Sequence, residues 1–120
     1  MARVLVAEDE AELGQTLIEV LEGAGHEACY TTRCDAALEL ARSFAPDLVI
    51  SDWALAGPSD GLALIESLRA ERPLVRAILM TGYPSARLRE RAAADAALGL
   101  LEKPFSLAEL RAAVARALAP

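Results

Sequence analysis

The chain is poor in several residue types that define common functional sites: its 120 residues include one lysine, one histidine and two cysteines, and 4% are aromatic. Cys29 and Cys34 lack the CxxC spacing of metal and redox sites, and His26 has no ligand-like neighbour in the sequence. We therefore expect two reduced thiols. The single histidine also argues against a histidine-rich metal site and against a histidine-carrying phosphotransfer module.

Negative charges outnumber positive ones, by 18 acidic to 12 basic residues, and long apolar runs are absent. The formal net charge of −6 argues against nonspecific binding of nucleic acid and against docking on an anionic membrane. No apolar run approaches the ~20 residues of a membrane span, and the first apolar segment is too short for a signal peptide. With 54% hydrophobic and 25% charged residues, the composition is that of one compact domain, which we expect in the cytoplasm.

Short apolar runs alternate with segments of helical period along the whole chain. Strands are expected at Val4–Ala7, Glu27–Thr31, Leu48–Ile50, Ala77–Met80 and Leu98–Leu101, and helices at Leu13–Ala24, Asp35–Phe44, Gly61–Glu71, Ser85–Ala94 and Leu107–Leu118. Four of the strands lack polar alternation, which is typical of a parallel sheet covered by helices on both faces. The second strand is more polar and is expected at an edge. Five strand–helix repeats predict a doubly wound α/β domain.

Turn and cap residues support these boundaries. Gly25 is a suitable end for the first helix, and Pro46 stops the second. Ser106 followed by Glu109 is typical of a capping box at the start of the last helix.

Polar side chains follow the four most apolar strands. Glu8 and Asp9 follow the first strand, Asp52 the third, Thr81 the fourth and Lys103 the fifth. Parallel strands place their carboxyl ends on one rim, where ligands of open α/β sheets bind. The topology therefore predicts that these five side chains meet.

Three carboxylates in one crevice repel one another and need compensating charge. A carboxylate-rich site completed by phosphate suits Mg²⁺, and Lys103, the only lysine, supplies a compact second positive charge. The Thr81 hydroxyl is a neutral donor, and an aspartate can act as a nucleophile that forms an acyl phosphate. We assign the phosphoryl group to Asp52, at the end of a central strand, and the cation to the Glu8–Asp9 pair.

Four motifs resemble the receiver domain of two-component response regulators, of the chemotaxis-regulator type: VLVAEDE, VISDWAL, ILMTGYP and LLEKPFS. The resemblance covers essentially the whole chain and implies one receiver domain over residues 1–120. It also implies a flavodoxin-like (βα)₅ fold whose five-stranded parallel sheet has the strand order 2-1-3-4-5.

The resemblance implies a function in a two-component system or phosphorelay, as a regulator whose only chemistry is its own phosphorylation and dephosphorylation. Asp52 would accept phosphate from a histidine kinase or a histidine phosphotransfer protein. Asp9, Asp52 and the backbone carbonyl of Ala54 would bind Mg²⁺ directly, while Glu8 would act largely through water. The phosphoryl group would contact Thr81 and Lys103.

Three departures from the family pattern concern the loop after Asp52 and the switch. The usual proline four residues after the acceptor is replaced by Ala56, Pro58 comes later, and the loop is one residue longer than in many members. The aromatic residue usual three positions before the lysine is Leu100.

The family's output surface comprises the fourth helix, fifth strand and fifth helix. Since Leu100 cannot make the aromatic swing, we expect the signal to leave through the loop after Thr81 and the arginine-rich helix that follows. This surface would include Tyr83, Arg87, Leu88 and Arg91.

Two other functions remain open. One is a Mg²⁺-dependent phosphohydrolase with an aspartate nucleophile, although such enzymes usually need an acid where this chain has Ala54. The other is a receiver-like interaction domain that is never phosphorylated. The 120 residues contain no output domain, which would be a fused or separate partner.

Overall fold

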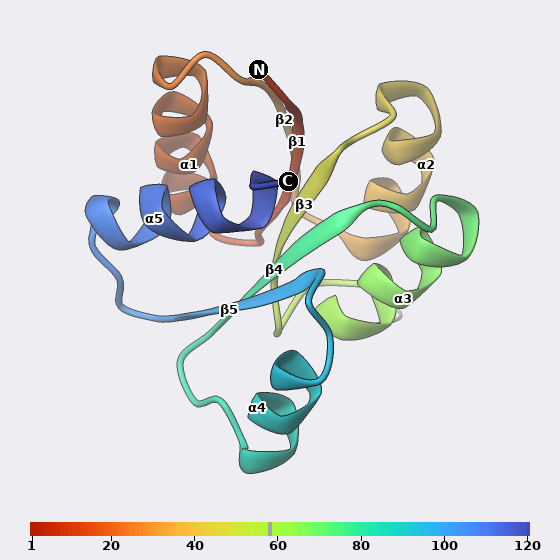
Figure 1. The fold of residues 1–120 in the computed structure, drawn as a ribbon. Coiled ribbons are helices and arrows are strands. Elements are labelled where there is room, and N and C mark those ends of the chain that lie inside the picture. The colour runs from red at the N-terminus through yellow and green to blue at the C-terminus, as the bar shows by residue number, and fades with distance from the viewer. Residues whose placement is uncertain (58) are drawn as a thin grey trace.

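The computed structural model describes residues 1–57 and 59–120, which form alternating strands and helices (Figure 1). The strands are β1 (Arg3–Ala7), β2 (Glu27–Thr31), β3 (Leu48–Asp52), β4 (Arg76–Thr81) and β5 (Leu98–Glu102). The helices are α1 (Ala11–Gly23), α2 (Cys34–Phe44), α3 (Gly61–Glu71), α4 (Ala86–Ala93) and α5 (Leu107–Leu118). Every element predicted from the sequence is present.

The strands form one parallel sheet with the order β2-β1-β3-β4-β5, which confirms the predicted topology. The order reverses between β1 and β3, which lie side by side in the register Val4↔Leu48 to Ala7↔Ser51. The more polar β2 lies at an edge, as expected. The ends of β1 and β3 therefore flank the switch point at which open α/β sheets bind ligands.

Helices cover both faces of the sheet. In Figure 1, α1 and α5 lie on one side, and α2, α3 and α4 lie on the other. Alternate residues of each central strand accordingly enter two separate cores, so that Val4 and Val6 pack with α1 and α5 whereas Leu5 and Ala7 pack with the opposite layer. This two-sided burial explains why β1, β3 and β4 read as continuous apolar runs.

Three strands extend further than their apolar runs. Backbone pairing continues through Asp52↔Met80 and Thr81↔Glu102, so β3, β4 and β5 end on polar residues. The ladder uses backbone groups and does not depend on the polarity of the side chain. Asp52 and Thr81 are consequently held by the sheet itself and not by a loop.

The helix ends agree with the cap residues. Ser106 Oγ accepts a hydrogen bond from Glu109 N at 3.0 Å while the Glu109 carboxylate accepts one from Ser106 N, forming the predicted capping box. Gly25 adopts a φ of +90° immediately after the C-cap residue of α1, Ala24, where glycine is favoured. Within the described residues, none of the helices combines the length and apolarity needed to cross a membrane.

Candidate functional site

The first part of the site is the corner at the end of β1. Glu8 is 1% exposed, whereas Asp9 is exposed. The Glu8 backbone N–H donates to the Thr31 carbonyl at 3.1 Å, and its side-chain Oε1 accepts a hydrogen bond from Glu10 N at 3.1 Å. The Glu8 side chain is thus anchored at the rim of the sheet, and Asp9 next to it faces solvent.

The second part is Asp52 at the end of β3, which is 7% exposed. The Ser51 hydroxyl donates to the Asp52 backbone carbonyl at 3.0 Å, and the next amide, Trp53 N, donates to Met80 O at 2.8 Å. Gly61 begins α3 so close to this carbonyl that a β-carbon would lie 2.1 Å from the oxygen. The backbone on both sides of the Asp52 carboxylate is therefore closely confined.

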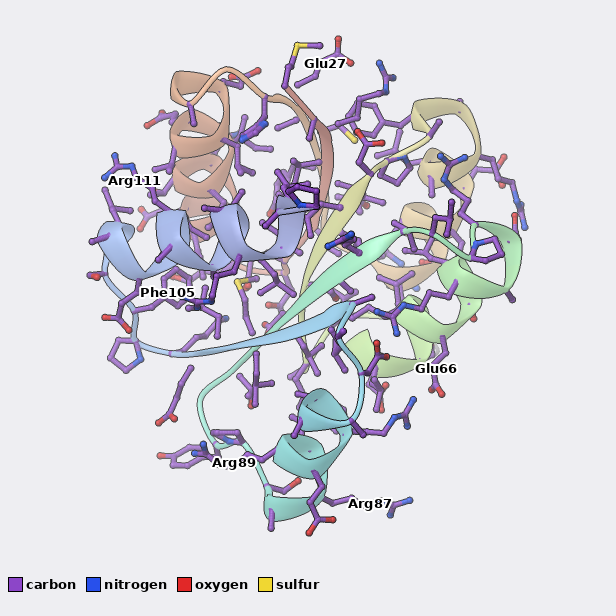
Figure 2. All side chains as sticks on the ribbon, viewed as in Figure 1. Glu27, Glu66, Arg87, Arg89, Phe105 and Arg111 are labelled. Carbon is purple, nitrogen blue, oxygen red and sulfur yellow. The ribbon has the colours of Figure 1, made fainter. Side chains whose placement is uncertain are left out.

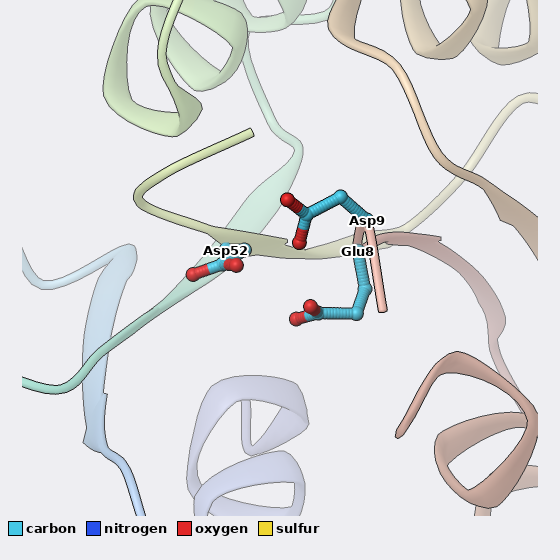
Figure 3. A group of neighbouring side chains, drawn as sticks. All are labelled: Glu8, Asp9 and Asp52. Carbon is cyan, nitrogen blue, oxygen red and sulfur yellow. The ribbon is translucent and has the colours of Figure 1, made fainter. Parts of the chain in front are cut away.

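The three carboxylates converge beyond the strand ends. Glu8, Asp9 and Asp52 each offer an oxygen, and these oxygens lie within 4.8 Å of one another. Figure 3 shows the side chains of Glu8 and Asp9 reaching from adjacent positions toward the space beside Asp52. Hard oxygen donors at this separation fit a divalent cation such as Mg²⁺.

Lys103 joins two of these carboxylates. Its Nζ lies 3.1 Å from Glu8 Oε2 and 3.3 Å from Asp52 Oδ2, and its backbone N–H donates to the Thr81 carbonyl at 2.8 Å. β5 therefore delivers an ammonium group between residues that are far apart in sequence. This convergence is expected, because parallel strands place their carboxyl ends on one rim of the sheet.

The charges at this site perturb one another. Burial raises the pKa of Glu8 from 4.5 to about 7, an effect strengthened by Asp52 and opposed by the Glu10 N–H and by Lys103. Burial alone would lower the pKa of Lys103, but the hydrogen bond to Glu8 and the charges of both carboxylates outweigh it and raise that pKa. The Lys103 side chain is therefore a stable ammonium that partly neutralises the carboxylates.

Thr81 and Ala54 are the other two residues expected at the phosphate and cation site. Thr81 is buried, and its hydroxyl oxygen accepts a hydrogen bond from Tyr83 N at 3.2 Å, which leaves the hydroxyl proton available to another acceptor. Ala54 is exposed and lines an open hollow together with Asp9 and Trp53. Ala54 and Asp9 thus face the same hollow.

The loop after Asp52 is attached to the start of α2. The Ala56 carbonyl accepts a hydrogen bond from Cys34 N at 2.9 Å, and Cys34 Sγ accepts one from Ser59 N at 3.4 Å. Gly57 has a φ of +118°, and a β-carbon there would lie 2.5 Å from Cys34 Sγ. Cys34 and Gly57 thus hold the loop in the absence of the usual proline. Pro58 lies outside the described residues.

The expected partner surface is only partly present as a surface. Tyr83 is 95% exposed and Arg87 is exposed, but Leu88 is 6% exposed and packs into the core, so it is removed from the surface. This correction follows from helical period, which turns one residue of α4 inward between exposed arginines. Leu100 is half-buried and packs against the same core.

Ion pairs reduce the positive charge of α4. Arg89 pairs with Glu102 at 3.3 Å, and Arg91 pairs with Glu66 of α3 at 3.1 Å. Figure 2 shows Arg87 and Arg89 on α4, at the end of the molecule remote from the N-terminus. Arg87 forms no ion pair with any residue that the structure describes.

One contact to the acidic corner, which Glu8 and Asp9 form at the end of β1, was not predicted. The hydroxyl of Tyr30, in β2, donates to the backbone carbonyl of Glu8 at 2.8 Å. The sequence contains no signal for it, because the contact joins a side chain of an edge strand to a backbone group 22 residues away. Gly14 is an indirect clue at most, because glycine is unfavourable within a helix.

The chain is a doubly wound α/β domain in which three carboxylates and a lysine meet at one rim of the sheet. The sequence matches the family "Response regulator receiver domain" over residues 4–115, and the chain belongs to this family. It is a receiver domain of a response regulator, consistent with two-component signalling.

Curated relatives are longer proteins. The chain is 34% identical over 116 residues to the DNA-binding transcriptional regulator NtrC of Escherichia coli K12, covering 96% of this chain and 24% of NtrC. It is 34% identical over 113 residues to the transcriptional regulatory protein PdtaR of Mycobacterium tuberculosis H37Rv, covering 93% of this chain and 54% of PdtaR. The chain thus spans about a quarter to a half of these relatives.

Solved structures show the same fold. The non-phosphorylated receiver domain of HemR from Leptospira biflexa superposes with a TM-score of 0.89 at 28% identity, covering 100% of this chain and 96% of that one. The chemotaxis protein CheY4 of Vibrio cholerae gives a TM-score of 0.86 at 26% identity, covering 98% and 99% of the two chains.

Proposed function

We propose that this domain, residues 1–120, accepts a phosphoryl group on Asp52 from a histidine kinase or a histidine phosphotransfer protein. The carrying observation is that the Lys103 ammonium lies between the Asp52 and Glu8 carboxylates, at 3.3 and 3.1 Å, on the rim where the strand order reverses. Phosphoryl transfer depends on positioning and on neutralising the charge of the transferred oxygens. An aspartate beside an ammonium and a cation-binding carboxylate cluster meets both needs.

In the proposed site, Asp9, Asp52 and the Ala54 carbonyl would bind Mg²⁺ directly, and Glu8 would act through water. The bound cation would neutralise part of the charge on the phosphoryl oxygens. Lys103 then turns from its carboxylate partners toward one phosphoryl oxygen, and the Thr81 hydroxyl donates to another. The ammonium can make this move because a flexible stem carries it as a point charge.

In the proposed reaction, the phosphoryl group moves from the donor histidine to Asp52. An Asp52 carboxylate oxygen attacks phosphorus, forming an O–P bond, while the P–N bond to the donor imidazole breaks. The electron pair of that bond returns to the imidazole nitrogen, which is protonated from solvent. Hydrolysis of the acyl phosphate restores Asp52, and the domain has no other reaction in this proposal. We place the step in the cytoplasm, where ATP sustains the phosphohistidine donor.

Intact-mass measurement tests this assignment. Incubation with acetyl phosphate and Mg²⁺ should add one phosphoryl group to the wild-type chain and none to Asp52→Asn. Asp35→Asn is a matched control, because it makes the same chemical change at an exposed aspartate of α2. Unchanged phosphorylation of Asp52→Asn would refute the acceptor assignment, and no phosphorylation of the wild type would favour an interaction domain without phosphoryl chemistry.

We further propose that phosphorylation changes partner binding through α4, β5 and α5, with the loop after Thr81 as the moving element. The Thr81 hydroxyl contacts Tyr83 N, so a shift of Thr81 toward phosphate would break that hydrogen bond and release the start of α4. The partner would be a fused or separate output domain, and the receiver domain itself would contact neither nucleic acid nor a membrane directly. A ligand shifts a two-state element only by its differential affinity for the two states.

Amide NMR shifts with and without beryllofluoride, a phosphoryl mimic, test this route. Large changes from Thr81 to Arg91 and small ones at Leu100 are expected. Changes centred on Leu100 that persist in Tyr83→Ala would contradict it.

A further inference from the structure

Tyr30 lies beside the acidic corner although it belongs to an edge strand. Its ring is half-buried and packs against the core beneath α1 and α5. Its hydroxyl donates to the Glu8 backbone carbonyl at 2.8 Å, a normal length for an O–H···O hydrogen bond. Neither the meeting of polar residues at the strand ends nor the family resemblance assigns this side chain a role.

Two residues of β2 form hydrogen bonds with the backbone N–H and C=O groups of Glu8. The Glu8 N–H donates to the Thr31 carbonyl at 3.1 Å, and the Glu8 carbonyl accepts from the Tyr30 hydroxyl. The Glu8 carbonyl and the Asp9 N–H belong to one planar peptide group, so fixing one fixes the orientation of the other. The hydrogen bond from Tyr30 therefore constrains the peptide group through which the chain continues from Glu8 to Asp9.

Gly14 makes room for the tyrosine ring. A β-carbon at Gly14 would lie 2.3 Å from Tyr30 Cε1 and 2.4 Å from Cζ, so no larger residue fits while the ring keeps its position. Glycine is unfavourable within a helix, and Gly14 lies in the second turn of α1. The close ring contact gives a physical reason for this glycine and couples α1 to the corner through Tyr30.

We propose that Tyr30 is a positioning residue for the cation site: its hydroxyl holds the Glu8–Asp9 peptide so that both carboxylates face the cation. The inference rests on the proposed function, because it assumes that Glu8 and Asp9 hold Mg²⁺. Partners that orient metal ligands without touching the metal contribute measurably to metal affinity. Tyr30 acts here on the backbone between two ligands.

Isothermal titration with Mg²⁺ tests the role directly. Tyr30→Phe keeps the ring and removes only the hydroxyl, and it should weaken Mg²⁺ binding roughly three- to tenfold, as expected for one hydrogen bond. Thr16→Val is the matched control, because the Thr16 hydroxyl also donates to a backbone carbonyl, that of Glu12 at 3.0 Å, on the exposed side of α1. Its Mg²⁺ affinity should equal that of the wild type.

A second variant reaches the same hydroxyl from the other side. Gly14→Ala displaces the Tyr30 ring and should weaken Mg²⁺ binding to a similar extent. Combining Gly14→Ala with Tyr30→Phe should weaken binding no further than either change alone, because both remove the same hydrogen bond. Full additivity of the two losses would overturn the coupling.

The outcomes separate this inference from the proposed function. If the wild type binds Mg²⁺ and Tyr30→Phe binds it equally well, the positioning role is overturned and the cation site stands. An equal loss in Tyr30→Phe and Thr16→Val also overturns it, since a merely structural role for the hydroxyls explains such a result. If the wild type shows no Mg²⁺ binding, the proposed cation site itself fails, and the role of Tyr30 fails with it.

Discussion

Replacing Gly61 by alanine would test how closely α3 approaches the residue proposed to accept phosphate. The new β-carbon would lie 2.1 Å from the Asp52 carbonyl oxygen, 2.9 Å from its carbonyl carbon and 3.0 Å from Leu79 Cδ1. Two of these three atoms belong to the backbone, so no side-chain rotation relieves the overlap. Either the end of β3 or the start of α3 must move.

The expected loss of stability can be worked out from this contact. Overpacking costs about 1–3 kcal/mol, and a clash with backbone belongs at the upper end of that range. Alanine recovers at most about 1 kcal/mol through its higher helix propensity. We therefore expect Gly61→Ala to lower the free energy of unfolding by about 2 kcal/mol, and Tm by roughly 8 °C in a domain of this size.

Urea unfolding measures the effect, and Gly23→Ala is the matched control. Gly23 is the last residue of α1, and nothing lies within 4 Å of a β-carbon built there. The same substitution should raise stability at Gly23 by about 0.5–1 kcal/mol, opposite in sign to its effect at Gly61. If the two variants change the free energy of unfolding in the same direction and to the same extent, the inference that α3 closely approaches the Asp52 carbonyl is refuted. The folded fraction of the Gly61→Ala variant should also be phosphorylated by acetyl phosphate more slowly than the wild type. The reason is that misplacing the Asp52 carboxylate by a fraction of an ångström slows phosphoryl transfer.

Burial raises the pKa of Cys29 from 9.0 to about 11. The stability contributed by its protonated thiol is therefore complete below pH 9 and is lost as pH rises toward 11. In urea unfolding, the free energies of unfolding of the wild type and of Cys29→Ala should converge near pH 11. Burial alone would raise the pKa of Asp95, but its hydrogen bond to Arg69 outweighs this and lowers it; the pair should stabilise the wild type over Asp95→Asn at pH 7, and this advantage should disappear in urea unfolding near pH 2. Asp9→Asn should weaken Mg²⁺ binding in calorimetric titration, because it removes one of three clustered charges. Trp53, which is 37% exposed beside Asp9, should change its fluorescence on addition of Mg²⁺ and then beryllofluoride; constant emission in a phosphorylated protein would show that it does not sense the site.

The fold was predictable because local signals and topology agree. The runs around Val49 and Ile78 are apolar on both faces, which requires helices above and below the sheet, and cap residues such as Ser106 mark the helix ends. The meeting of Lys103 with Glu8 was predictable for a similar reason. It needs only that parallel strands end on one rim, a property of topology that does not depend on side-chain detail.

Other features depend on three-dimensional packing and could not be read from spacing. The burial of Leu88 follows from the rotation of a short helix whose sequence is mostly polar. The hydrogen bond from Tyr30 to the Glu8 carbonyl depends on the space left by Gly14. Such contacts depend on differences of an ångström between whole elements, whereas a hydrophobic pattern indicates only which face of an element is buried.

The choice of lysine at position 103 follows from the geometry of its partners. Arg42 illustrates the use of arginine on this surface: two of its nitrogens bind the two carboxylate oxygens of Glu71 at 3.1 and 3.2 Å, in the open. Exposed pairs of this kind contribute at most about 1 kcal/mol. At the rim, two carboxylates of different residues, Glu8 and Asp52, converge on a single nitrogen, which a compact ammonium satisfies and a planar fork does not. An ammonium is also free to exchange a carboxylate oxygen for a phosphoryl oxygen by rotation of its stem, so the same geometry that stabilises the free site is suited to receive the proposed phosphoryl group.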